Sequence, residues 1–169
     1  MSDEAPPAGG RARPMILLLV AAGIIVADQV TKALVVANLE VGERTRVIGD
    51  LVQIWHAQNR GAAFSLFQGG NLLFIAVTVV ALGMVVYFHR TFRERASWLH
   101  GVLGVVLGGT LGNFIDRLRL GYVTDFVSVG VGDLRFPAFN VADSSIVLGI
   151  GALVLYLFLA DPGRREARA

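Results

Sequence analysis

The sequence predicts an α-helical membrane protein with four transmembrane helices and a small extracytoplasmic β-rich cradle. Of the 169 residues, 54% are hydrophobic and only 17% are charged, whereas soluble domains carry about 25% charged residues. The apolar residues also gather into four stretches, each close to the roughly 20 residues that a helix needs to cross the hydrocarbon core. These stretches are Met15–Ala37, Asn71–Phe88, Trp98–Ile115 and Val141–Ala160.

The four stretches predict a single membrane domain over residues 15–160. Residues 1–14 are polar and rich in proline, glycine and alanine, a composition typical of disordered tails. Residues 161–169 form a second polar end. An even number of spans places both ends on the same side of the membrane. We expect both to be cytoplasmic tails, as the distribution of arginines indicates.

Arginines predict the orientation of the helices. Arg90, Arg93 and Arg95 crowd the short connection between the second and third stretches, and further arginines flank the first and fourth stretches. Positive residues concentrate on the cytoplasmic side of membrane proteins. Both termini and this connection are therefore expected in the cytoplasm, and the longer connections, 38–70 and 116–140, face outward.

The outward connections carry signals of extended structure. Thr45–His56 is rich in β-branched and aromatic residues, which favour strands. Val123–Val131 has the same character. We therefore expect a small β layer over the outer ends of the helices.

Glycines recur along the third stretch. Gly104, Gly108 and Gly112 are four residues apart, so they share one helix face and allow a neighbouring helix to approach closely. We expect Gly104 to serve packing alone. Gly108 and Gly109 are also expected to make room near the polar end of this helix.

Two aspartates beside apolar segments are the leading candidates for chemistry. Asp125 lies in Gly121–Phe126 (GYVTDF), and Asp143 lies in Phe139–Ile146 (FNVADSSI). Carboxylates at or near hydrocarbon are energetically expensive and need a functional explanation by default. Two of them at the ends of different segments indicate a pair that shares one proton, which is the chemistry of an aspartyl hydrolase.

Asp143 also has a purely structural interpretation. Asn140 fits a helix N-cap and Asp143 the third position of a capping box, with Pro137 just upstream. This does not exclude catalysis, since a helix start holds a carboxylate rigidly. Asp125 lacks such an explanation, because its surroundings contain few turn-forming residues.

Other polar residues near the outer ends have open interpretations. Asp28 and Lys32 are four apart on the first helix, and we favour a structural ion pair over direct chemistry. Asn59 indicates a turn, or an amide that hydrogen-bonds a substrate backbone. Asn113 shares a helix face with Asp116. Arg117 either forms an Asp116–Arg117 pair at a capped helix end or orients a carboxylate or a substrate carbonyl.

Several function classes lack their sequence signatures. The chain has no cysteine, its three histidines are scattered, and it contains neither H-E-x-x-H nor G-x-S-x-G. The string GVGD at 130–133 is interpreted as a turn with Asp133 exposed. No basic run with interleaved aromatics indicates nucleic acid binding. No metal or other cofactor is predicted.

Taken together, the polar segments resemble the bacterial lipoprotein signal peptidases, the signal peptidase II family. Their order and spacing fit that family, and the resemblance covers roughly Met15 to Ala160. The matching segments are DQVTK (Asp28–Lys32), NRGAAFS (Asn59–Ser65), GGTLGNFIDR (Gly108–Arg117), VTDFV (Val123–Val127) and FNVADSSI (Phe139–Ile146).

The resemblance implies a multi-pass aspartyl endopeptidase of the bacterial inner membrane. Such enzymes cleave signal peptides from prolipoproteins just before a cysteine that carries a diacylglyceryl group, and their substrate's lipid lies in the bilayer. It implies that Asp125 and Asp143 are the catalytic pair. It further implies that a set of polar residues lines or supports the site, namely Asn59, Asn113, Arg117, Asn140 and Asp28. Four helices of this length suit a monomer.

Two other classes remain as alternatives. Intramembrane carboxylates with an Asp–Lys pair also suit a small proton-coupled transporter or channel. That alternative predicts ion flux that is lost when either aspartate is changed. A non-enzymatic scaffold would use the glycine face for association, and it leaves Asp125 unexplained.

Overall fold

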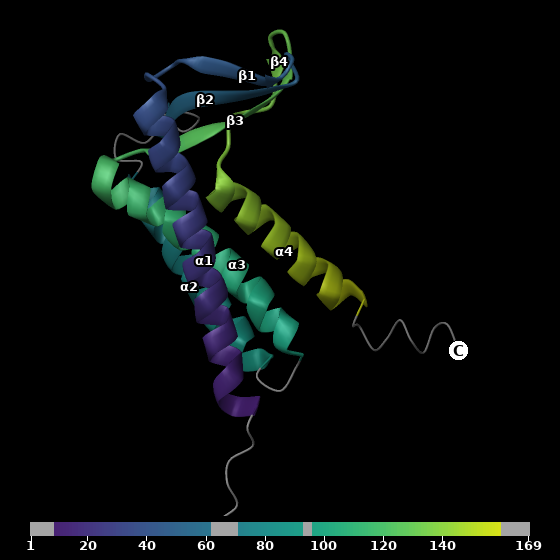
Figure 1. Cartoon of the computed structure of the whole chain (residues 1–169). Helices are drawn as coiled ribbons and strands as arrows, with labels where there is room; N and C mark the ends of the chain where they lie inside the picture. Colours follow the sequence, from purple (N-terminus) through teal and green to yellow (C-terminus); the bar gives the residue numbers. More distant parts are fainter. Residues whose placement is uncertain (1–8, 62–70, 93–95, 160–169) are drawn as a thin grey trace, which may run out of the picture.

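The computed structural model describes residues 9–61, 71–92 and 96–159, and within them it consists of four long helices and one antiparallel sheet (Figure 1). The elements in chain order are α1 (Gly9–Asn38), β1 (Arg44–Ile48), β2 (Val52–Asn59), α2 (Asn71–Thr91), α3 (Ser97–Leu120), β3 (Val123–Val131), β4 (Leu134–Arg135) and α4 (Val141–Leu159). The four strands are hydrogen-bonded in the order β1-β2-β3-β4. The predicted small β layer is thus confirmed.

Three helices in the described part of the chain are long and apolar enough to cross a membrane. They comprise Arg13–Asn38, Ser97–Leu120 and Val141–Leu159, and they correspond to the first, third and fourth predicted spans. The second predicted span forms α2, a helix of 21 residues. The structure therefore confirms a mainly helical protein with apolar, span-length helices.

The first helix begins earlier than predicted. α1 starts at Gly9, so part of the expected tail over residues 1–14 is helical instead. The apolar stretch nucleates the helix, and arginine and alanine at 11–13 favour its extension, although Pro14 inside the helix has no N–H to donate. Residues 1–8 and the predicted tail at 161–169 lie outside the described residues.

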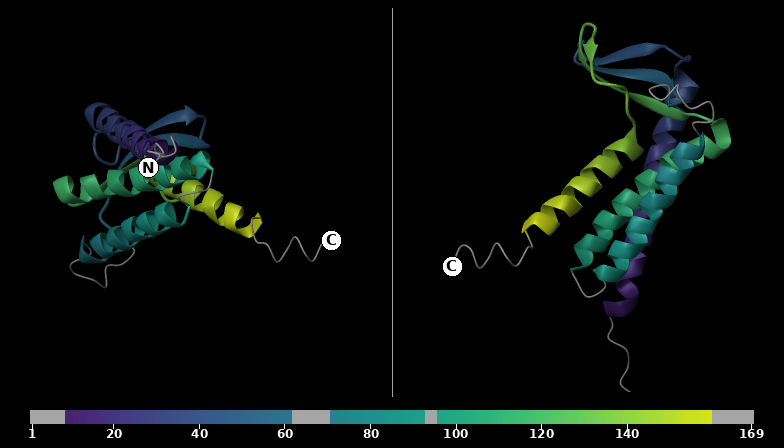
Figure 2. Two further views of the ribbon diagram at one scale, coloured as in Figure 1. Left: turned by 90° about the horizontal axis from the view of Figure 1, so that it is seen from below. Right: turned by 180° about the vertical axis from the view of Figure 1, so that it is seen from behind.

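α3 is the central helix, and it contacts α1, α2 and α4 (Figure 2). The predicted close approach is confirmed where α1 packs on α3. A Cβ atom on Gly104 would lie 2.6 Å from the Leu17 carbonyl oxygen, and one on Gly108 would lie 2.7 Å from that of Ala21. Gly108 therefore serves helix packing rather than the polar end of α3.

The sheet lies across one end of the helices, and α4 leans away from the other three as it leaves the sheet (Figures 1 and 2). Gly121 caps the C-terminal end of α3, and its φ of 77° lies in the left-handed region that glycine adopts without strain. The chain then enters β3 directly. Residues at the end of α3 and the start of β3 are consequently brought next to the first turn of α4.

The interior of the bundle is mainly apolar at one end and mainly polar at the other. The buried apolar cluster joins the start of α1 and α3 to the end of α2 and α4, far from the sheet, and comprises Leu17, Val85, Phe92, Leu99, Leu103, Val106 and Leu153. At the sheet end the buried side chains are mostly polar. They include Asp28, Lys32, Asn113, Asp116, Thr124, Asp125 and Asn140.

Candidate active site

Asn140 binds both candidate catalytic aspartates. Its side-chain amide nitrogen donates to Asp125 Oδ1 at 2.8 Å. Its side-chain oxygen accepts the backbone N–H of Asp143 at 2.9 Å, and its own backbone N–H donates to Asp143 Oδ2 at 3.1 Å. The predicted capping box is therefore confirmed, and the same box brings the Asp143 carboxylate beside Asp125.

Asn59 holds the second oxygen of Asp125. The two residues lie on the adjacent strands β2 and β3, where Asn59 pairs with Val123 and so lies diagonally across from Asp125. The Asn59 amide nitrogen donates to Asp125 Oδ2 at 2.9 Å. Its oxygen accepts the backbone N–H of Gly61 at 2.9 Å, which fixes the orientation of the amide. Residues 62–65 of the segment that contains Asn59 lie outside the described residues.

Asn113 links Asp143 to a buried lysine. Its amide nitrogen donates to Asp143 Oδ1 at 2.7 Å. Its oxygen accepts from Lys32 Nζ at 3.1 Å and from the Asn140 amide at 3.1 Å. Each of the four oxygens of Asp125 and Asp143 thus accepts a hydrogen bond from an asparagine.

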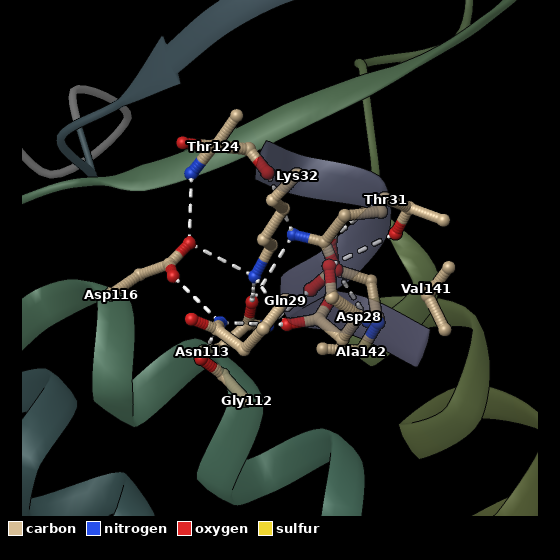
Figure 3. A network of polar contacts seen from close by, with 12 residues as sticks. Asp28, Gln29, Thr31, Lys32, Gly112, Asn113, Asp116, Thr124, Val141 and Ala142 are labelled. Atoms are coloured by element: carbon tan, nitrogen blue, oxygen red, sulfur yellow. Dashed lines mark hydrogen bonds and ion pairs between the residues drawn. The ribbon is translucent and has the colours of Figure 1, made fainter. Parts of the chain in front are cut away.

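Lys32 is the centre of a buried ionic network (Figure 3). Its ammonium group lies 2.8 Å from Asp28 Oδ2 and 2.9 Å from Asp116 Oδ2, and side-chain exposure is 5% or less for all three residues. The predicted Asp28–Lys32 pair is confirmed. Asp116 is the partner of Lys32 that the sequence did not predict, because Asp116 was expected on a face shared with Asn113 or in a helix-end pair with Arg117.

Asp28 also stabilises the start of α4. Its Oδ1 accepts the backbone N–H of Ala142, in the first turn of that helix, at 3.0 Å. The first N–H groups of a helix have no partner within the helix, and a carboxylate there is favoured by the helix dipole. A side chain of α1 therefore sets the position of the helix that carries Asp143.

Gln29 is a second residue that sequence reasoning missed. Its amide nitrogen donates to Asp116 Oδ1 at 2.9 Å, and the other Asp116 oxygen accepts the backbone N–H of Thr124 at 3.1 Å. Asp116 thereby ties α1 and α3 to the start of β3. An amide inside an otherwise apolar helix was the available signal for Gln29.

Arg117 lies within the electrostatic reach of the pair. Its side chain is partly exposed, and one guanidinium nitrogen donates to the Asn113 carbonyl oxygen at 3.4 Å. The carboxylates that interact most strongly with its charge are Asp143 and Asp125. Of the two sequence interpretations, this arrangement favours an arginine that orients a carboxylate over a simple helix-end pair with Asp116.

The environment of Asp125 favours its protonated form. Burial raises the pKa of Asp125 to about 6, and the charge of Asp143 adds to this effect. The hydrogen bonds from Asn59 and Asn140 and the charge of Lys32 oppose it. A buried carboxyl beside a second carboxylate is the arrangement in which two acids share one proton.

Gly112 makes room for the ionic network. A Cβ atom there would lie 2.7 Å from Asp28 Oδ2, and that oxygen is held by Lys32. We expect Gly112→Ala to destabilise the protein by about 1–3 kcal/mol, the usual effect of overpacking. Thermal unfolding of the purified protein measures this. Gly151→Ala, where nothing lies within 4 Å, is the matched control and should unfold no earlier than wild type; equal melting of the two variants would contradict the prediction.

Among the described residues, no group of three or more histidine, aspartate or glutamate side chains is arranged to hold a metal ion. The polar residues of the site are instead engaged with one another through the contacts given above.

Comparison with known proteins identifies the family. The sequence profile described as "Signal peptidase (SPase) II" matches residues 20–159. The chain belongs to the signal peptidase II family. The lipoprotein signal peptidase of Shouchella clausii is 41% identical over 151 residues, which cover 89% of this chain and 97% of that protein. The lipoprotein signal peptidase of Enterococcus faecalis is 35% identical over 154 residues, which cover 91% of this chain and 94% of that protein.

Solved structures agree with this assignment. A bacterial membrane enzyme determined at 1.9 Å by the in meso method has a TM-score of 0.73 and 30% identity, covering 83% of this chain and 91% of that chain. A second such structure, at 2.3 Å, has a TM-score of 0.71 and 30% identity, and the match covers 84% of this chain and 87% of that chain. The resemblance drawn from the motifs is thus confirmed. This signal peptidase II homologue is a peptidase located in a membrane.

Proposed function

We propose that the chain is an aspartic endopeptidase that removes signal peptides from bacterial lipoproteins, with Asp125 and Asp143 as its catalytic pair. The observation that carries this proposal is that one residue, Asn140, binds both carboxylates: its side-chain amide donates to Asp125, and its backbone N–H donates to Asp143. The names of the relatives and the motifs together indicate the substrate, a diacylglyceryl-modified prolipoprotein that is cut before its lipidated cysteine.

The reaction follows from a pair that holds one proton. The ionised carboxylate takes a proton from water as the water oxygen attacks the scissile carbonyl carbon. The protonated carboxyl gives its proton to the carbonyl oxygen, and a tetrahedral diol forms. The carboxyl that took the water proton then passes it to the amide nitrogen, the other carboxylate takes a diol proton, and the C–N bond breaks. The pair returns to its starting state.

The surrounding residues hold the pair in place. Asn59, Asn113 and Asn140 orient the two carboxylates through the amide contacts described above. Arg117 stabilises the negative charge of the pair. Asp28 fixes the start of α4 and thereby positions Asp143, which lies in the first turn of that helix.

The proposal extends to the topology of the protein. α2 forms the fourth membrane span, and residues 15–160 act as one domain, as a monomer in the bacterial inner membrane. His89 and Arg90 occupy the last turn of α2, at the end far from the sheet, and by the positive-inside rule this end faces the cytoplasm. The sheet and the catalytic pair then face outward, close to the surface of the membrane, with both termini inside.

Ion transport has less support. Among the described residues, the carboxylates of the network gather at the sheet end of the helices, whereas the opposite end holds the buried apolar cluster and one fully buried ionisable side chain, His100. A relay across the bilayer needs ionisable groups along its length.

Cleavage by the purified protein in lipid nanodiscs tests the proposal. The substrates are a diacylglyceryl-modified prolipoprotein and the same chain without the lipid, and mass spectrometry locates the cut. We expect one cut before the modified cysteine, and no hydroxamate product in hydroxylamine, because direct water attack forms no acyl-enzyme. A lack of cleavage together with proton flux in vesicles would favour the transporter, and a hydroxamate would exclude the aspartic mechanism.

A further inference from the structure

The two members of the pair lie in different electrostatic surroundings. Asp143 sits in the first turn of α4, where its Oδ2 accepts a backbone N–H at 3.1 Å and its Oδ1 accepts from Asn113 at 2.7 Å. A helix N-terminus and a backbone donor both favour negative charge. Its side chain is also partly exposed, so it keeps part of its hydration.

Asp125 lies on β3, which offers no comparable dipole, because strand dipoles largely cancel. It is 2% exposed. Its two described donors are the neutral side-chain amides of Asn140 and Asn59, at 2.8 Å and 2.9 Å. The rise in its pKa, caused first by burial, agrees with this setting.

The two nearby cations act in opposite directions. The charge of Lys32 on α1 favours the ionised form of Asp125, but this charge is balanced by Asp28 and by Asp116 on α3. Arg117 on α3 is the other nearby cation, and its strongest attraction is to Asp143. Both the helix end and the guanidinium therefore favour charge on Asp143.

The asparagine amides fix where a proton on Asp125 points. The oxygen of Asn140 is engaged by the backbone of Asp143, and the oxygen of Asn59 by the backbone of Gly61. Both amides therefore present N–H groups to Asp125 and cannot accept its proton. An Asp125 O–H must point away from both asparagines.

We propose that the singly protonated pair carries its proton on Asp125 and its negative charge on Asp143. Asp143 is then the general base and Asp125 the general acid, a division of roles that rests on the proposed peptidase function. Asp143 takes a proton from water while the water oxygen bonds to the scissile carbon. Asp125 gives its proton to the carbonyl oxygen. On collapse of the diol, Asp143 protonates the leaving nitrogen as the C–N bond breaks, and Asp125 recovers a proton from the diol.

Infrared spectroscopy of the substrate-free protein in nanodiscs tests this assignment. The carbonyl stretch of a protonated carboxyl group is followed in difference spectra as the pH falls from 8 to 5. We expect wild type and the Asp133→Asn control to gain a band with a midpoint at about pH 6. Asp125→Asn should lose that band. Asp143→Asn should keep it with a lower midpoint, because the like charge beside Asp125 is gone.

Asn59→Ala provides an independent test. In the described contacts, the Asn59 amide binds Asp125 but does not bind Asp143. Loss of a donor to the ionised form should move the midpoint to higher pH. A band that survives in Asp125→Asn but disappears in Asp143→Asn, a band halved in both, or an unmoved midpoint in Asn59→Ala would overturn the assignment.

Cleavage assays on the same preparations separate the two proposals. If wild type does not cut the lipidated substrate, the proposed peptidase function fails. If wild type cuts and needs both aspartates, but the band belongs to Asp143, only the division of roles fails.

Discussion

Asp125→Asn and Asp143→Asn are each expected to lower kcat for prolipoprotein cleavage by about a hundredfold to ten-thousandfold. Each variant removes one of the two proton transfers, and positioned acid or base groups contribute about 10²–10⁴-fold. Asparagine has nearly the same shape as aspartate, but its NH2 group cannot accept a hydrogen bond, so one of the two N–H donors to each carboxylate loses its acceptor. Initial rates with the diacylglyceryl-modified substrate measure the effect.

Asp133→Asn is the matched control for this experiment. Asp133 is exposed in the turn between β3 and β4, far along the strand from Asp125. The same charge is removed there, and the cleavage rate should stay within about twofold of wild type, as expected for a surface substitution. Activity retained by either of the first two variants, or lost in the control, would contradict the assignment of the pair.

The stability of Asp125→Asn separates loss of chemistry from loss of folding. The pKa of Asp125 is raised in the folded protein to about 6, so wild type is most stable while this carboxyl is protonated and loses that stability as the pH rises through 6. The asparagine variant has no such loss. We therefore expect its melting temperature, relative to wild type, to increase between pH 5 and pH 8. A relative decrease over this range would contradict the burial argument.

Lys32→Met is expected to destabilise the protein by about 3–5 kcal/mol, the usual effect of removing one partner from a buried ion pair. Lys32 neutralises Asp28 and Asp116 at 2.8 Å and 2.9 Å, and methionine leaves both carboxylates buried without a counter-ion. Asn113 also loses one of the two donors to its oxygen, and the Asn140 amide remains. Thermal unfolding measures the first effect, and the cleavage rate of the remaining folded protein measures the second.

A second substitution tests whether charge is the cause. Lys32→Met with Asp116→Asn removes one of the two unbalanced carboxylates, so it should recover part of the lost stability. If Lys32→Met melts as wild type does, or if the double variant is less stable than the single one, the network does not depend on its ionic balance.

Much of the fold follows from local pattern. The apolar stretches predicted the helices, and the β-branched segments predicted the strands, because each pattern depends only on residues that are neighbours in sequence. The start of α1 was predicted too late, since a helix extends beyond the apolar residues that nucleate it. Neither pattern specifies that α4 leans away from its neighbours, nor that its first turn lies so close to Gly109 of α3 that a Cβ atom there would be 2.5 Å from the Ala142 carbonyl oxygen.

Within the site, the sequence alone determined the contacts between residues three or four apart. The Asn140–Asp143 capping box and the Asp28–Lys32 pair are of this kind, because helix geometry fixes which neighbours meet. The motifs, taken together, also led to the family. Only the tertiary structure decided that Lys32 reaches Asn113, 81 residues away, that Asp28 binds the first turn of α4, 114 residues away, and that Asn140 joins Asp143 to Asp125. Those contacts depend on the distances between packed helices and the sheet, and no periodicity along the chain contains that information.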